Sequence, residues 1–128
     1  MLTRHNPGTV APPFSPYSHG VAAPAGARWL HLAGQVGVRP DGTMAEGVEA
    51  QSEQAFLNIF EILHHAGMSK HDLVKITVFL LDRQHLDEFR AARNRLLLPA
   101  EPASTLVFVA GLARPDFLVE IEAIAAAA

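Results

Sequence analysis

The stretch DLVKITVFLL at residues 72–81 decides the fold class of this 128-residue chain. Two sets of its residues would lie on opposite faces of a strand expected over Val74 to Leu81: Ile76, Val78 and Leu80 on one face, Lys75, Thr77 and Phe79 on the other. The first face is entirely apolar, so the segments on either side of the strand have to cover it.

Both flanking segments have the periodicity of helices. From Val48 to Ala66, apolar residues recur at three-to-four spacing and would form one buried stripe: Ala55, Ile59, Ile62, Leu63 and Ala66. Gly67 follows in the position of a left-handed cap. After the strand, Asp82 is predicted to cap a second helix, which Pro99 ends. The inward residues of that helix would be Leu86, Phe89 and Leu96 or Leu97.

Further strands are expected before the first predicted helix and after the second. Tyr17 to Val21 and Ala27 to Ala33 are predicted to pair across residues 23–26, with Trp29 and His31 on one face and Leu30 and Leu32 on the other. Residues 40–43, Pro-Asp-Gly-Thr, predict a turn. Ser104 to Ala110 and Phe117 to Ala125 are two further predicted strands.

The two ends of the chain are expected to be irregular. Four prolines within residues 1–16 predict an extended lead-in, and the alanine-rich tail after Ile124 is expected to fray. The order strands, helix, strand, helix, strands predicts one domain over residues 1–128, of α+β or mixed α/β class, with both helices on one face of a sheet.

Composition excludes several classes of function. The net charge is −3 with ten Lys and Arg residues and no basic run, which argues against a polyanion partner such as nucleic acid. The chain has no cysteine, so disulfides, thiolate metal sites and a cysteine nucleophile are excluded. We see no signal peptide and no apolar run long enough to span a membrane, so the cytoplasm is the expected compartment. Hydrophobic residues make up 49%, which suggests that a partner subunit covers some apolar surface.

Six segments carry a resemblance to a known family: FSPYSHGV (14–21), AGQV (33–36), AG (66–67), DLVKITVFL (72–80), PASTLV (102–107) and VEIEAIA (119–125). In this order and spacing they resemble the RidA family, also called YjgF/UK-type proteins, which are trimeric enamine and imine deaminases. The resemblance runs from about Phe14 to Ala125. It implies a six-stranded mixed sheet backed by two helices, assembled as a homotrimer with its active sites in clefts between subunits. It implies no cofactor and a small-molecule substrate.

Glu120 and Glu122 are the carboxylates that could carry this chemistry. They are two residues apart on a predicted strand, so both point to the same face. Glu120 matches the family glutamate that positions the hydrolytic water, and a carboxylate can move a proton to nitrogen while holding water near carbon. The alternative is that one or both carboxylates pair with a lysine or arginine on a neighbouring strand.

Four further residues match or adjoin the family's cleft. Tyr17 matches a tyrosine that lines it, although this ring could instead pack in the core. Gly34 and Gln35 match a Ser-Gly-Gln segment, where glycine lets a ligand approach the backbone. His19 adjoins the cleft segment and could supply a polar contact there, whereas His31 is expected to pack.

The chain departs from the family at Ser104. Active members usually have Pro-Ala-Arg-Ser where this chain has Pro-Ala-Ser-Thr, and the missing arginine clamps the substrate carboxylate. Serine offers one hydroxyl in place of a charged, bidentate fork. An α-imino acid should therefore bind poorly unless Arg93 or Arg114 reaches the cleft, although Arg93 is expected to be a solvent-exposed helix residue.

No metal is expected. Glu61 and His65 are at i and i+4 on the predicted helix and could supply two ligands to a metal, but no third ligand lies nearby in the sequence. The adjacent His64 and His65 point about 100° apart on a helix.

The leading hypothesis is water addition to a small enamine or imine without an α-carboxylate. A non-catalytic metabolite binder on the same scaffold is the alternative. The ribonuclease or translation-inhibitor activity ascribed to some relatives fits the acidic composition less well.

Overall fold

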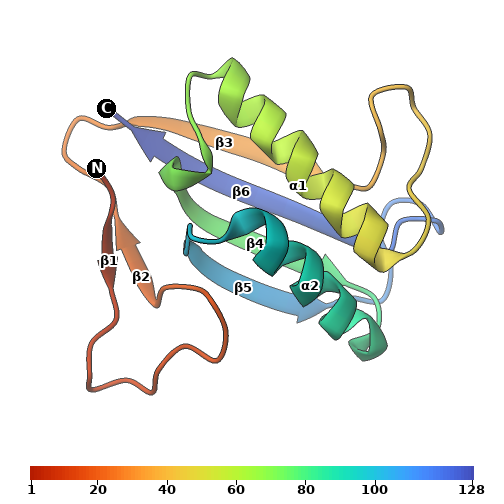
Figure 1. Cartoon of the computed structure of the whole chain (residues 1–128), viewed down its shortest axis with the longest axis horizontal. Coiled ribbons are helices and arrows are strands. Elements are labelled where there is room, and N and C mark those ends of the chain that lie inside the picture. The colour runs from red at the N-terminus through yellow and green to blue at the C-terminus, as the bar shows by residue number, and fades with distance from the viewer.

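Two helices cover one face of a four-stranded sheet, and a small two-stranded ribbon lies beside them (Figure 1). The computed structural model describes residues 1–128. The elements in chain order are β1 (Thr3–His5), β2 (Gly20–Ala22), β3 (Arg28–Gln35), α1 (Val48–His65), β4 (Leu73–Leu80), α2 (Leu86–Leu97), β5 (Ala103–Phe108) and β6 (Val119–Ala127). Short 3₁₀ turns at Lys70–Asp72 and Arg83–His85 precede β4 and α2.

The sheet has the strand order β3-β6-β4-β5. β4 and β5 are parallel, and α2 lies in the crossover between them, as a parallel connection requires. The last strand, β6, lies in the middle of the sheet and is antiparallel to both β3 and β4. The C-terminal segment therefore joins the two halves of the sheet.

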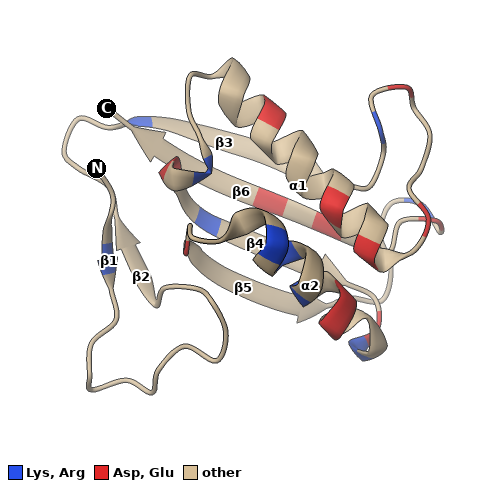
Figure 2. Cartoon of the chain, in the orientation of Figure 1, with Lys and Arg blue, Asp and Glu red and all other residues tan.

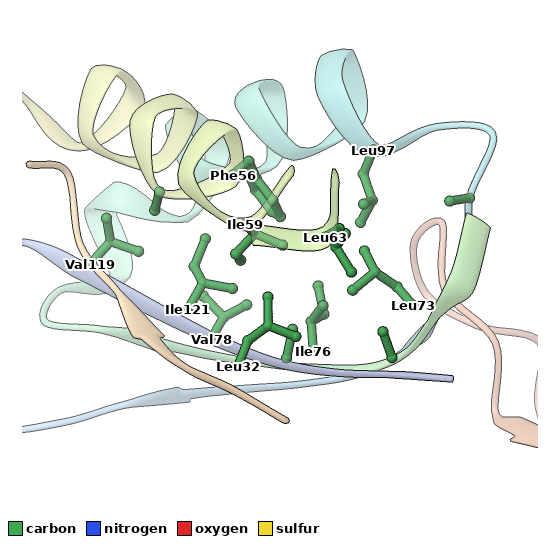
Figure 3. Close-up of a cluster of buried hydrophobic side chains, with 14 of the residues drawn as sticks. Leu32, Phe56, Ile59, Leu63, Leu73, Ile76, Val78, Leu97, Val119 and Ile121 are labelled. Atoms are coloured by element: carbon green, nitrogen blue, oxygen red, sulfur yellow. The ribbon is translucent and has the colours of Figure 1, made fainter. Parts of the chain in front are cut away.

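The core lies between the sheet and the two helices (Figure 3). Ile76, Val78 and Leu80 of β4 are all buried, and the alternation predicted for this strand is confirmed. In the first helix, Ala55, Ile59 and Leu63 are buried as expected, while Ile62 and Ala66 are only half-buried. The inward residues of α2 that are fully buried are Phe89 and Leu97. Full burial of each large side chain is worth about 1.5–3 kcal/mol, so this layer supplies most of the driving force for folding.

Local signals at the helix ends also behave as predicted. Gly67 adopts φ 72°, the left-handed conformation of a helix cap. The Asp82 side chain accepts a hydrogen bond from the Gln84 amide and so caps the 3₁₀ turn that leads into α2. Gly42 in the predicted turn adopts φ 88°.

Four predictions about strands were wrong. Residues 20–22 pair with β1 inside the supposed lead-in, and β3 pairs with β6, so no hairpin forms across residues 23–26. The lead-in thus contains a strand, Thr3–His5. The sheet is not six-stranded, because the β1–β2 ribbon stands apart from the four strands. The alanine-rich tail does not fray: Ala123, Ala125 and Ala126 are buried within β6.

The fold leaves one face of the sheet without a helix. Trp29 on this face is 52% exposed, and Val107 on β5 is also exposed. No helix of the chain combines the length and the apolar character that a membrane-crossing segment needs.

Candidate functional site

Glu120 lies against Gly34 where β3 is interrupted. The register of β3 on β6 shifts between Leu32 and Gln35, which marks a bulge, and bulges re-aim side chains beside functional sites. A Cβ added at Gly34 would lie 2.8 Å from Cδ of Glu120 and 2.9 Å from its Cγ. Only glycine therefore leaves room for this carboxylate beside the bulge. Within the bulge, Nε2 of Gln35 donates a hydrogen bond to the Ala33 carbonyl at 3.1 Å.

Neither Glu120 nor Glu122 forms an ion pair, so the alternative that these carboxylates pair with neighbouring cations was wrong. Glu120 is half-buried and Glu122 is exposed, although both point to the face without helices, in register with Phe79 and Thr77. A half-buried carboxylate with no cationic partner is free to accept and return a proton.

Glu122 borders a hollow of about 350 Å³ on this open face, together with His31, Lys75 and Thr77. Lys75 donates from Nζ to the Thr105 hydroxyl at 2.6 Å. His31 is exposed, so the expectation that it packs was wrong. This polar group was not singled out from the sequence, although His31, Lys75 and Glu122 all fall on the outer face of their strands.

Gln51 holds the start of β6 in place and was also missed. This α1 side chain is 3% exposed. Its Nε2 donates to the Asp116 carbonyl at 3.1 Å, and its Oε1 accepts from the Leu118 amide at 2.9 Å. It thus positions the backbone two residues before Glu120. A glutamine at a buried helix position is the only sequence signal that could have pointed to this role.

The segment that contains Tyr17 and His19 is fixed to the start of β5. Ser18 is buried, donates from its hydroxyl to the Glu101 carbonyl at 2.5 Å, and bridges Ala103 in parallel. Tyr17 is half-buried, and its hydroxyl accepts weakly from the Phe14 amide at 3.5 Å. The His19 ring contacts the Tyr17 ring edge-on at 5.8 Å, and its Nε2 lies 2.6 Å from the Ala11 carbonyl.

Ser104 and Glu120 lie on opposite faces of the sheet. Ser104 is in register with the buried Ile76, on the helix side, whereas Glu120 is in register with Phe79 on the open side. The strands that carry them, β5 and β6, are separated by β4 and so run roughly 10 Å apart, and the two residues are also offset by three positions along β4. Within one chain these two residues cannot line one cleft.

Arg93 is buried, at 4% exposure, and the interpretation of it as a solvent-exposed residue was wrong. Burial, and to a smaller extent the positive charge of Arg90, lowers the pKa of Arg93. Its guanidinium donates to the Asn94 side chain at 3.0 and 3.2 Å and to the Ser15 hydroxyl at 3.4 Å. Arg114, the other candidate, is exposed and pairs with Asp116 at 2.9 Å.

Comparison with known proteins identifies the family. The model of the Endoribonuclease L-PSP family matches residues 8–127. The 2-iminobutanoate/2-iminopropanoate deaminase of Mus musculus is 35% identical over 112 residues, which cover 86% of this chain and 80% of that protein. A RutC family protein of Pyrococcus horikoshii is 35% identical over 115 residues, 88% of each chain. The crystal structure of a Rid family protein of unknown function from Yersinia pestis superposes with a TM-score of 0.86 and 34% identity, covering 97% of each chain.

The chain belongs to the RidA/YjgF family. The assignment of Tyr17, Gly34, Gln35 and Glu120 to the RidA cleft, and of Ser104 to the position of the usual arginine, stays a prediction from the sequence. No three His, Cys, Asp or Glu side chains are grouped so that they could hold a metal. The RidA-family match thus covers nearly the whole chain, including both helices and all four strands of the main sheet.

Proposed function

We propose that this protein hydrolyses a small reactive enamine or imine in the cytoplasm, at clefts between the subunits of a homotrimer. The observation that carries the proposal is the half-buried Glu120 carboxylate, which has no cationic partner and lies against Gly34. The names of relatives such as the mouse 2-iminobutanoate/2-iminopropanoate deaminase support the reaction class.

Glu120 would serve first as a base and then as an acid. Its carboxylate takes a proton from water as the water oxygen bonds to the imine carbon, and the C=N double bond becomes a C–N single bond. The resulting carboxyl group returns the proton to nitrogen. The Glu120 carboxylate then moves the hydroxyl proton of the carbinolamine to the nitrogen as the C–N bond breaks and the C=O bond forms. The sum is imine plus water giving a carbonyl compound plus ammonia. An enamine enters the same route after protonation at carbon.

The opposite placement of Ser104 and Glu120 supports a cleft between subunits. One cleft can contain both positions only if two chains contribute to it. The open sheet face, with Trp29 and Val107 exposed, is the apolar surface that such an assembly would cover. Tyr17, which is attached to the start of β5 through Ser18, would line the cleft from the Ser104 side.

The substrate class follows from Ser104. A neutral hydroxyl cannot replace a desolvated, bidentate arginine, and losing such a clamp costs roughly 2–5 kcal/mol of binding. We therefore propose a substrate without an α-carboxylate. If the cleft binds such compounds but turns none over, the alternative of a metabolite-binding protein on the same scaffold holds instead.

The test is an ammonia-release screen of imines and enamines with and without a carboxylate. Glu120→Gln should abolish release and leave the fold and assembly unchanged, because glutamine keeps the shape and cannot take a proton from water. Glu122→Gln is the matched control, since this exposed carboxylate on the same strand should be dispensable. Equal loss in both variants, or full activity in Glu120→Gln, would overturn the assignment. Salt-sensitive RNA binding or RNA cleavage would favour the ribonuclease alternative.

A further inference from the structure

Two arginines on α2 carry positive charge that nothing in the chain neutralises. The chain forms four ion pairs, and none of them includes Arg90 or Arg93. Arg95 on the same helix differs, because it is exposed and its guanidinium lies within 4 Å of carboxylates of both Glu49 and Glu53. Figure 2 shows blue segments along α2 together with red ones, and the two acidic residues of this helix, Asp87 and Glu88, lie in its first turn.

The guanidinium of Arg93 is only partly satisfied. Nε and Nη2 both donate to the single Asn94 oxygen, and Nη1 reaches the Ser15 hydroxyl at the limit of hydrogen bonding, 3.4 Å. A guanidinium has five N–H groups, so two remain without an acceptor. The Phe89 ring, 5.8 Å from the Arg93 carbon Cζ, supplies an apolar wall and cation–π contact but no hydrogen-bond acceptor.

Arg90 adds a second unsatisfied donor beside the first. Its Nε is buried and has no hydrogen-bond partner. It lies three residues before Arg93 and therefore on the same side of the helix. Two neighbouring cations in a buried setting repel each other, and an uncompensated buried charge is strongly unfavourable. Burial and the charge of Arg90 both lower the pKa of Arg93, as expected for an unpaired cation.

We propose that Arg93, which reaches the Ser15 hydroxyl, and Arg90, one turn earlier on α2, form a binding site for a small oxyanion, a carboxylate or phosphate group. Two free N–H groups of one planar guanidinium match the two oxygens of such a group. The Ser15 hydroxyl can rotate and donate to the bound anion. A phosphate group could neutralise both arginines and a carboxylate one of them, and either would fasten the lead-in segment at Ser15 to α2.

This site is separate from the carboxylate proposed to act on the imine. Arg93 lies on a helix, on the covered side of the sheet, whereas Glu120 is on the open side. Anion binding therefore does not depend on whether Glu120 hydrolyses anything. The Glu120→Gln variant should bind the anion as the wild type does, so the two proposals fail independently.

The experiment titrates the full-length protein with inorganic phosphate and, separately, with propionate at constant ionic strength. Calorimetry gives the affinity, and the side-chain Nε–H resonance of Arg93, assigned by its loss in Arg93→Gln, reports the site directly. We expect saturable binding of at least one probe with a Kd on the order of 1 mM, which corresponds to about 4 kcal/mol. The probe that binds more tightly identifies the headgroup.

The control variant is Arg95→Gln, which removes the same charge from the same helix at an ion-paired, exposed position. Arg93→Gln should raise the Kd at least tenfold, while Arg95→Gln should leave it unchanged. Arg93→Lys keeps the charge without the planar fork and should weaken binding several-fold. Arg90→Gln, at a half-buried position, tests the site if Arg93→Gln does not fold.

Three results would overturn the proposal. One is the absence of saturable binding of either probe at concentrations on the order of 100 mM, far above the expected Kd. Another is equal affinity in Arg93→Gln and Arg95→Gln, which would mean nonspecific attraction. The third is a wild type that binds neither probe together with an Arg93→Gln variant that has a smaller oligomer mass. That combination would mean that a carboxylate of a second copy of the chain neutralises Arg93.

Discussion

Replacing Gly34 with alanine should separate activity from stability. The added Cβ would lie 2.8 Å from Cδ of Glu120, whereas carbon atoms in favourable contact are about 3.5–4.0 Å apart. Because the carboxylate oxygen Oε2 of Glu120 would lie nearer still, the carboxylate must move by at least about 1 Å. A misplacement of that size at a catalytic group costs roughly 100-fold in rate, or about 2.7 kcal/mol of transition-state stabilisation.

The effect on stability should be much smaller. The overlapping atoms belong to the far end of a flexible side chain, and holding it off its preferred rotamer costs roughly 0.5–1.5 kcal/mol. Replacing a glycine that has an ordinary φ by alanine also stabilises the fold by about 0.4–1 kcal/mol, because it lowers the conformational entropy of the unfolded chain. The net change in the free energy of unfolding should stay below about 1 kcal/mol.

The assay is ammonia release on the best substrate of the screen, with urea unfolding of the same samples. Gly111→Ala is the matched control, because no atom lies within 4 Å of a Cβ added there. Gly34→Ala combined with Glu120→Ala should be at least as stable as Glu120→Ala alone, since the overlap is then removed. Wild-type activity in Gly34→Ala, or a stability loss of several kcal/mol that persists in the double variant, would refute the proposed contact.

We make three further predictions. Light scattering should give a mass three times the 13.8 kDa of one chain; a stable monomer at micromolar concentration would exclude the proposed cleft. Ser104→Arg should raise activity on 2-iminopropionate or 2-iminobutyrate, on which the wild type should be weak; a wild type as fast as an arginine-containing relative would contradict this account. Gln51→Leu should lower the free energy of unfolding by about 2–3 kcal/mol in urea, because it leaves the Leu118 amide and Asp116 carbonyl without their side-chain partner, whereas Gln84→Leu, at an exposed side chain that forms no hydrogen bond, should change it little.

The sequence was a good guide wherever the signal was local. The alternation around Ile76, the stripe containing Ile59 and the cap at Gly67 each depend on neighbours within a few residues, and all three were confirmed. The pairing of Glu120 and Glu122 on one face was equally predictable, because side chains two apart on a strand share a face whatever the strand's partners are.

Tertiary packing decided what sequence spacing could not. Residues 20–22 could pair with either of two segments, and β6 could lie at an edge or in the middle, because strand partners are chosen by burial across the whole molecule. Alanines near Ala125 look like an unstructured tail, yet Ala123, Ala125 and Ala126 are buried within β6, which pairs with a strand on either side.

The same distinction holds for the candidate site. Sequence resemblance alone indicated Glu120 and the change at Ser104, since both are read by aligning residues. Only the structure could set these two positions on opposite faces of the sheet, because facing depends on register between strands. Only the structure could show that Arg93 is buried without a carboxylate, since a helix arginine is exposed or enclosed according to what the distant Ser15 segment and Phe89 do around it.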